Sequence, residues 1–125
     1  MNIVDSSFWI EYFGNGNYAS TIEDVILDID NLIVPTVTLT EVFKWVLRER
    51  NEMAALSAVS VMKYGTIVEL TEIIAINAAY YGNQFKLPLA DSFIFSYTQY
   101  YNATLYTMDK HFKGLRNVEY FEKKL

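Results

Sequence analysis

The chain has 125 residues, of which 52% are hydrophobic and 16% aromatic, and its formal net charge is −5. This length predicts one domain over residues 1–125, and the hydrophobic content excludes a disordered chain. No apolar run reaches the about 20 residues of a membrane helix, and no charged, then apolar leader opens the sequence. Because cysteine is absent, disulfides and thiolate chemistry are excluded. We therefore expect a cytoplasmic protein with no membrane partner.

Hydrophobic periodicity predicts strands that alternate with helices along the chain. In chain order the pattern gives strand 2–5, helix 8–13, helix 18–29, strand 32–34, helices 36–50 and 52–64, strand 66–70, helices 71–85 and 90–101, and strands 104–107 and 118–121. Gly and Pro residues separate several of these segments. This order predicts an α/β fold in which a mainly parallel sheet lies between two helical layers.

Four acidic residues follow or interrupt the apolar segments of the chain. Asp5 ends the first strand, and Asp109 follows the strand over residues 104–107. Asp91 lies in the first turn of a helix, and Glu41 lies one turn into an apolar helix. Carboxylates are rarely buried unless they are paired, hydrogen-bonded or bound to metal. Four of them beside core-forming segments therefore predict one shared site.

The expected topology brings these carboxylates together. Sites in open α/β sheets form beyond the carboxyl ends of the strands, which is where at least three of the four acids lie. Clustered carboxylates raise one another's pKa, and a divalent cation removes that cost. Hard oxygen ligands suit Mg²⁺ or Mn²⁺, which activate water for attack on a phosphodiester. The pattern therefore predicts a metal-dependent enzyme of phosphate chemistry.

The net charge argues against a general nucleic-acid-binding surface. Setting the four carboxylates aside leaves 11 acidic residues against 10 Lys and Arg, so the rest of the surface is nearly neutral. Lys110, Lys113 and Arg116 follow Asp109 closely and are the best local candidates for RNA phosphate contacts. A solvated basic turn explains these three residues equally well.

The segments around the four acids resemble the motifs of the PIN-domain family, most closely those of VapC-type toxins. They are NIVDSSFWIEYF at residues 2–13, VTLTEV at 37–42, LPLADSFI at 87–94 and LYTMDKHF at 105–112. The four motifs occur in the family's order and span almost the whole chain. Two departures are the bulky residues that follow Asp91 and Met108, which stands where a basic residue is common.

The resemblance implies a Mg²⁺- or Mn²⁺-dependent endoribonuclease. Asp5, Glu41, Asp91 and Asp109 take the places of the catalytic, metal-binding quartet, and Ser7 and Thr107 those of hydroxyl residues near the metal. The resemblance also implies a homodimer and a cognate antitoxin whose C-terminal segment blocks the site. Five tyrosines exceed what a small core needs and could supply apolar surface for either contact: Tyr80, Tyr81, Tyr97, Tyr100 and Tyr101.

Other interpretations remain open at this stage. A PIN nuclease of RNA processing or quality control would carry the same acids without an antitoxin. A receiver-like signalling domain and a non-catalytic PIN module are further alternatives. Individually, Asp5 and Asp91 could cap helices, and Asp109 could be a turn residue. Glu41 could pair with Lys44 or Arg48, and His111 could be solvated or contact RNA.

Overall fold

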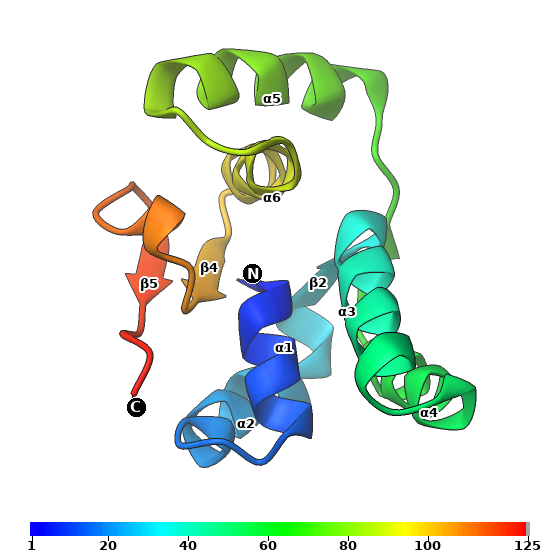
Figure 1. Cartoon of the computed structure of the whole chain (residues 1–125). Helices are drawn as coiled ribbons and strands as arrows, with labels where there is room; N and C mark the ends of the chain where they lie inside the picture. The colour runs from blue at the N-terminus through cyan, green and yellow to red at the C-terminus, as the bar shows by residue number, and fades with distance from the viewer. Residues whose placement is uncertain (125) are drawn as a thin grey trace.

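The computed structural model describes residues 1–124 (Figure 1). Its strands are β1 (Asn2–Val4), β2 (Leu32–Pro35), β3 (Thr66–Val68), β4 (Thr104–Thr107) and β5 (Val118–Tyr120). Its α-helices are α1 (Ser6–Phe13), α2 (Ala19–Leu27), α3 (Thr36–Glu49), α4 (Glu52–Met62), α5 (Glu72–Phe85) and α6 (Leu89–Tyr100). Two short 3₁₀ helices, η1 (Ile29–Asn31) and η2 (Lys110–Phe112), complete the described elements.

The five strands form one sheet in the order β3-β2-β1-β4-β5, and each neighbouring pair is parallel. In the central register, Ile3 lies opposite Ile33 on one side and Leu105 on the other. The predicted parallel sheet is therefore confirmed. Because the strands share one direction, the residues that follow them lie at the same edge of the sheet, here called the carboxyl edge.

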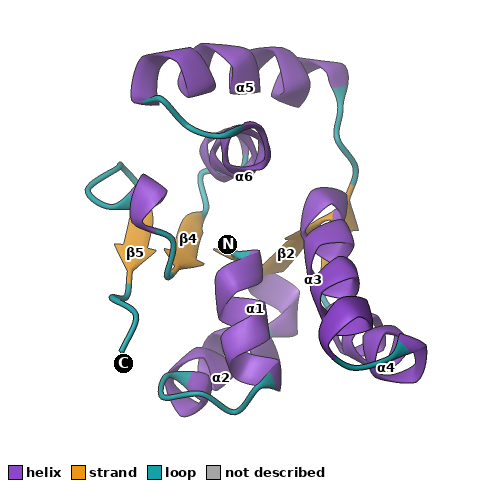
Figure 2. Ribbon diagram, in the orientation of Figure 1, coloured by secondary structure: helices purple, strands orange, loops and turns teal. Residues whose placement is uncertain are grey.

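Helices cover both faces of the sheet (Figure 2). Val4, Leu32 and Val34 pack with helices α1 to α4 on one face. On the other face, Ile3 and Ile33 pack with helices α5 and α6. Strands buried on both faces need apolar residues at successive positions, as the run Leu32-Ile33-Val34 shows. The expected three-layer α/β/α architecture is confirmed.

Element boundaries differ from the sequence-based expectation by only one or two residues. The third strand ends at Val68 rather than Leu70 because Val68 pairs with Pro35, the last residue of β2. Beyond that pair β3 has no partner on β2. Within residues 1–124, no helix combines the length and the apolar composition needed to cross a membrane.

Candidate functional site

Asp5 joins β1 directly to α1 and is almost completely buried, with 3% of its surface exposed. Its Oδ2 accepts hydrogen bonds from Thr107 Oγ1 at 2.8 Å and Ser7 Oγ at 3.0 Å. The residue occupies the N-cap position of α1, but its side chain makes no capping hydrogen bond. Helix capping therefore does not explain why a carboxylate is buried at this position.

The two hydroxyl groups that hold Asp5 also hold the segment after β4. Thr107 Oγ1 accepts a hydrogen bond from the backbone N–H of Asp109 at 2.9 Å. Ser7 Oγ accepts one from the backbone N–H of Met108 at 3.1 Å. Each hydroxyl thus donates to the carboxylate and accepts from the backbone. As a result, Asp5 and Asp109 have a fixed spatial relation before any ligand binds.

Asp91 and Asp109 form a more open part of the site, together with His111. Asp91 lies in the first turn of α6, and His111 lies in η2. The ring nitrogen Nδ1 of His111 is 2.9 Å from Asp91 Oδ2 and 2.9 Å from Asp109 Oδ1. Ligand atoms of these three residues lie within 4.8 Å of one another, a spacing that could hold a metal ion. The imidazole therefore stands between two carboxylates, where a cation is favoured.

Glu41 projects from the second turn of α3 and is half-buried. Among residues 1–124 it forms no ion pair with Lys44 or Arg48, and Arg48 instead lies 3.8 Å from Glu49. The alternative of a helix-surface ion pair is therefore not what the structure shows. The pKa of Glu41 is raised to about 7, mainly by burial and then by the charges of Asp5 and Asp109.

The other two perturbed carboxyl groups respond to the same neighbours. Burial raises the pKa of Asp5, and the charge of Asp109 adds to this, whereas hydrogen bonds from Thr107 and Ser7 oppose it. Burial raises the pKa of Asp91 to about 7, and the charges of Asp109 and then Asp5 contribute further. Mutual repulsion of this kind requires proximity. The structure thus brings all four acids together at the carboxyl edge.

This donor set fits a divalent cation. Four carboxyl groups converge, and within residues 1–124 no Lys or Arg forms an ion pair with any of them. Carboxylate oxygens are the ligands that Mg²⁺ and Mn²⁺ prefer, and a bound cation removes the repulsion that raises these pKa values. Asp109 also caps η2 by accepting a hydrogen bond from the His111 backbone N–H at 2.9 Å, and this role is compatible with metal binding.

Two cavities border Asp109 on either side. The first, of about 490 Å³, lies over α1 and includes Ser7, Glu11, Trp45 and Lys123 in its lining. The second, of about 670 Å³, lies over η2 and the segment after β5, and its lining includes Lys110, His111, Tyr120 and Lys123. Both cavities therefore offer space for a ligand directly beside Asp109.

The three basic residues expected near the site occupy different environments. Lys110 lines the second cavity. The ammonium group of Lys113 lies 5.6 Å from the centre of the Tyr120 ring. Arg116 precedes β5 and so lies at the opposite edge of the sheet, where its Nε donates to Gln99 Oε1 at 2.8 Å. The structure therefore does not bring Arg116 to the four carboxylates.

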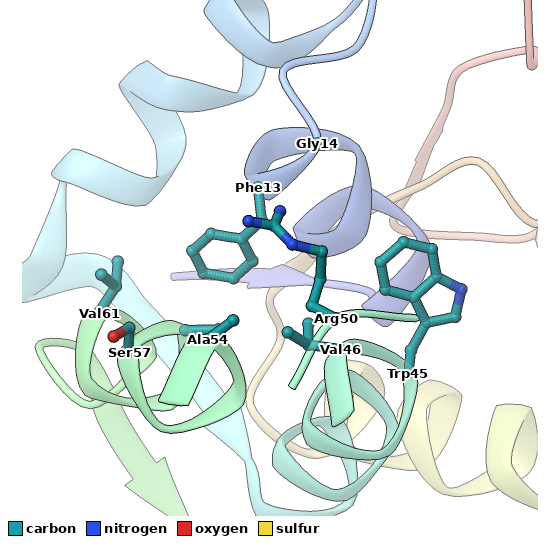
Figure 3. A pocket seen from close by; sticks show the side chains of 9 residues that line it. Phe13, Gly14, Trp45, Val46, Arg50, Ala54, Ser57 and Val61 are labelled. Carbon is teal, nitrogen blue, oxygen red and sulfur yellow. The ribbon is translucent and has the colours of Figure 1, made fainter. Parts of the chain in front are cut away.

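An apolar pocket of about 420 Å³ lies next to the first cavity, between α1 and the α3–α4 pair (Figure 3). Phe13, Val46 and Val61 contribute to its wall, and the Arg50 side chain extends toward Phe13. The pocket shares Gly14 and Trp45 with the first cavity. Apolar surface thus continues from this pocket to the edge of the acidic site.

Sequence reasoning missed two residues beside the carboxylates, His111 and Lys123. The short spacing between Asp109 and His111 is a signal that could have placed His111 at the site. From the sequence alone we instead expect a solvated residue or an RNA contact. Lys123 lies outside all four sequence motifs, so no sequence signal pointed to it. The surplus tyrosines divide between environments: Tyr97 is buried, Tyr81 and Tyr101 are half-buried, and Tyr80 and Tyr100 are exposed.

Comparison with known proteins gives a consistent assignment of fold. The family model of the PIN domain matches residues 3–118. No curated protein sequence matches the chain. A solved toxin–antitoxin complex from Klebsiella pneumoniae contains a chain that is 21% identical, with a TM-score of 0.82 over 98% of this chain and 100% of that one.

Two further solved structures resemble the chain at lower identity. VapC20 of Mycobacterium tuberculosis, described as a toxin that cleaves the sarcin–ricin loop, is 14% identical, with a TM-score of 0.73 over 87% of this chain and 90% of that one. VapBC2 of Rickettsia felis, bound to a promoter DNA fragment, is 15% identical, with a TM-score of 0.76 over 95% and 97%. At these identities the likeness establishes a shared fold.

Proposed function

Since this chain belongs to the PIN-domain family, we propose that it is a metal-dependent endoribonuclease and the toxin of a toxin–antitoxin pair. One observation carries the proposal: Asp5, Glu41, Asp91 and Asp109 converge at the carboxyl edge of the sheet. Three of them have a raised pKa in the absence of a cation. We take residues 1–125 as a single PIN domain, in keeping with the family match over residues 3–118.

In this proposal Asp5, Glu41, Asp91 and Asp109 are the catalytic residues that hold Mg²⁺ or Mn²⁺. When bound, the cation supplies a water of lowered pKa and neutralises charge on the phosphate oxygens. Ser7 and Thr107 keep the Asp5 carboxylate oriented through the hydrogen bonds already described. The same two hydroxyls accept hydrogen bonds from the backbone N–H groups of Met108 and Asp109. These bonds keep Asp109 at a constant distance from Asp5.

RNA would enter along the two cavities that flank Asp109. A nuclease with a net charge of −5 needs local cations to hold a polyanion. Lys110 in the second cavity supplies one such charge. Because the remaining surface is nearly neutral once the carboxylates bind metal, the acidic composition does not oppose this substrate.

Cleavage of RNA by the purified protein tests this function. We expect cleavage with Mg²⁺ or Mn²⁺, and no cleavage in excess EDTA. Asp5→Asn and Asp91→Asn should each lose activity by at least about 100-fold, because each removes a charged ligand. Asp24→Asn, on the exposed face of α2, is the matched control and should keep full activity. Full activity of both site variants, or cleavage in EDTA, would rule out the mechanism.

The antitoxin part of the proposal draws on the solved relatives and on the apolar pocket. The Klebsiella pneumoniae chain is described as part of a toxin–antitoxin complex. In this chain, apolar side chains of an antitoxin segment could bind in the pocket between Phe13 and Val61. The segment could then continue alongside Trp45 to the carboxylates. An Arg at its end would bind a carboxylate in bidentate fashion and compete with metal. We further propose that the pair acts in the cytoplasm, where the RNA substrate is also found.

Filling the apolar pocket tests the antitoxin contact separately from catalysis. Ala54→Trp places a bulky side chain at the pocket wall, away from Asp5 and Asp109. We expect this variant to cleave RNA normally and to escape inhibition by the co-expressed antitoxin. The matched control is Ser20→Trp, at an exposed position on α2. A complex that forms but leaves RNA cleavage and metal binding unchanged would contradict the blocking model.

The same family resemblance supports a homodimer. An apolar stripe on α5 is exposed and could form the contact between two copies: Ile73 and Ile76 are each 56% exposed, and Tyr80 is 71% exposed. These residues are spaced three and four positions apart, so they share one helical face. Sedimentation at micromolar concentration should show a dimer, and Ile76→Lys should shift it to monomer. A strictly monomeric wild-type protein would remove this part of the proposal.

A further inference from the structure

The two cavities beside Asp109 share one basic residue, Lys123. Both linings contain Met108, Asp109 and Lys123, and Lys123 is the only Lys or Arg among residues 1–124 that borders both. Lys110 borders the second cavity alone. The Lys123 side chain forms no hydrogen bond or ion pair within the described part of the chain. Its ammonium group is therefore available to a ligand in either cavity.

The backbone around Lys123 is held firmly although the residue lies in an irregular segment. The backbone N–H of Phe121 donates to Thr107 O at 2.9 Å, which continues the pairing of β4 with β5. The Phe121 ring packs edge-on against Phe8 and Tyr18, with centroid distances of 5.0 and 5.3 Å. These contacts fix the residue two positions before Lys123 against α1, the helix that carries Ser7.

Tyr18 holds the segment on both sides of Lys123. Its hydroxyl group donates to the backbone carbonyl of Glu122 at 2.6 Å, and the ammonium group of Lys124 lies 4.9 Å from the centre of its ring. The residues immediately before and after Lys123 therefore both contact Tyr18. The segment is anchored through its neighbours, and the Lys123 side chain is left free.

Tyr18 is itself positioned by Glu11 of α1. Glu11 Oε2 accepts a hydrogen bond from the Tyr18 backbone N–H at 3.0 Å. The loop between α1 and α2 closes on this carboxylate so tightly that a Cβ at Gly16 would overlap it. A larger residue at position 16 would therefore require the Glu11 carboxylate to move. A continuous set of contacts thus runs from α1 through Glu11 and Tyr18 to the segment that carries Lys123.

We propose that Lys123 is a substrate-binding residue that contacts an RNA phosphate beside the scissile one, and that Tyr18 positions it. The proposal rests on the ribonuclease function proposed above. A cation on the wall shared by both cavities attracts the phosphate backbone and guides the strand past Asp109. A phosphate contact of this kind fixes register without reading sequence, because the phosphate is the same at every nucleotide.

Steady-state cleavage of one RNA by Lys123 variants tests the inference. Lys123→Ala should raise KM about fivefold and leave kcat nearly unchanged, because a peripheral phosphate contact serves binding rather than chemistry. Between about 50 and 200 mM salt, the slope of log kcat/KM against log salt should fall by about 0.7, as one single-strand phosphate contact is lost. Lys123→Arg should restore both values, since it keeps the charge.

Tyr18→Phe tests the positioning role. It keeps the aromatic packing with Phe8 and Phe121 and removes only the hydroxyl group that binds the Glu122 carbonyl. We expect a smaller rise in KM than for Lys123→Ala, and no additional effect in the double variant Tyr18→Phe/Lys123→Ala. Additive effects of the two changes would show that Tyr18 does not act through Lys123.

The controls separate this inference from the function on which it rests. Lys63→Ala, at the exposed end of α4, should have the KM and salt slope of the wild type. If the wild type cleaves no RNA with Mg²⁺ or Mn²⁺, the proposed function is wrong. If the wild type cleaves RNA but Lys123→Ala matches Lys63→Ala in KM and salt slope, Lys123 is not a substrate-binding residue.

Discussion

The two halves of the acidic site are built in different ways. Asp5 is buried and accepts two hydroxyl hydrogen bonds, and those hydroxyls are fixed in turn by backbone N–H groups. Asp91 and Asp109 are more exposed, and they share a single ring nitrogen of His111. The His111 side chain is itself 55% exposed. The Asp5 carboxylate is therefore held by two hydroxyl donors, whereas the side chains of Asp91 and Asp109 depend on the partly exposed His111.

This difference shows how a protein can assemble a site that is unfavourable without its ligand. Neutral hydroxyl donors hold the most buried carboxylate and lower its pKa, so part of the burial cost is offset inside the fold. Within residues 1–124 no hydroxyl group donates to Asp91; burial and the acidic neighbours raise its pKa, and His111 opposes them. The second half should therefore respond more to metal than the first.

Neutralising one acid in each half should give the largest effects. We expect Asp5→Asn and Asp91→Asn both to weaken Mn²⁺ binding by about 100-fold or more, since each removes a charged ligand. Without metal, both variants should be at least as stable as the wild type, because they relieve repulsion. The gain should be larger for Asp91→Asn, because asparagine at position 5 leaves Ser7 and Thr107 with a weaker acceptor.

Calorimetric titration measures the Mn²⁺ affinity of each variant, and urea unfolding in EDTA measures its metal-free stability. A metal-free Asp91→Asn variant that unfolds more easily than the wild type would show that repulsion does not dominate this half. Equal stability changes in the two variants would remove the distinction between the halves.

Removing a hydroxyl from the half that contains Asp5 should have the next largest effect. Thr107→Val deletes the hydrogen bond to Asp5 Oδ2 and leaves the Asp109 N–H without its acceptor. We expect a loss of about 1–3 kcal/mol in the free energy of unfolding. Mn²⁺ affinity should fall by about 10–100-fold, as is typical when an outer partner of a metal ligand is lost.

Thr98→Val is the matched control for this change. Thr98 is also buried, but its hydroxyl donates to the Ile94 carbonyl within α6 and touches none of the four acids. We expect this variant to keep the metal affinity and RNA cleavage of the wild type. Normal Mn²⁺ binding by Thr107→Val would show that the hydroxyl network is not needed for preorganisation.

The pH dependence of stability should reflect the raised pKa values. The pKa of Glu41 is raised to about 7 in the folded protein, so the folded state binds this proton more tightly than the unfolded chain does. The stabilisation is complete at low pH and is lost as the pH rises from about 4.5 to about 7. We expect the metal-free melting temperature to fall over this range.

Metal should reverse this trend, because Mn²⁺ binds the deprotonated carboxylates and its affinity rises with pH. Melting curves of the wild type with and without Mn²⁺ measure both effects, and Glu41→Gln should show a shallower metal-free decline. A metal-free protein whose melting temperature rises between about pH 5 and 7 would contradict the inferred direction.

Replacing His111 should have the smallest effect. Its ring nitrogen lies between Asp91 and Asp109, and we interpret it as a hydrogen-bonding partner that metal displaces. His111→Ala should therefore bind Mn²⁺ a few times more tightly, and its metal-free stability should change by less than about 1 kcal/mol. Weaker Mn²⁺ binding would instead identify His111 as a metal ligand.

Most of the fold and the four acids could be predicted because they depend on local pattern and strand direction. Apolar runs located the strands, and parallel order placed the residues after them at one edge. The positions of Asp5 and Asp109 directly after strands were enough to predict that both lie at this edge. The family resemblance added Ser7 and Thr107, whose hydrogen bonds to Asp5 join segments that are far apart in sequence.

The remaining site features depend on contacts that sequence spacing does not reveal. His111 reaches both carboxylates because the chain turns at η2, where the His111 backbone N–H donates a hydrogen bond to Asp109 Oδ1. Lys123 lies beside Asp109 because long-range contacts hold its segment, among them the hydrogen bond from Tyr18 to the Glu122 carbonyl, 104 positions away. Arg116 was expected near the site from its closeness to Asp109 in sequence. The direction of β5 instead places it at the opposite edge.

The hydrogen bond from Thr107 to Asp5 spans 102 positions in the sequence, and the bond from Met108 to Ser7 spans 101. Contacts of such long range form late, since the intervening chain must be ordered before they can be made. During synthesis, the segment that carries Asp5 is therefore made long before its hydroxyl partner exists. The nascent chain cannot assemble the acidic site until translation has passed residue 109. The four carboxylates therefore come together only near the end of elongation.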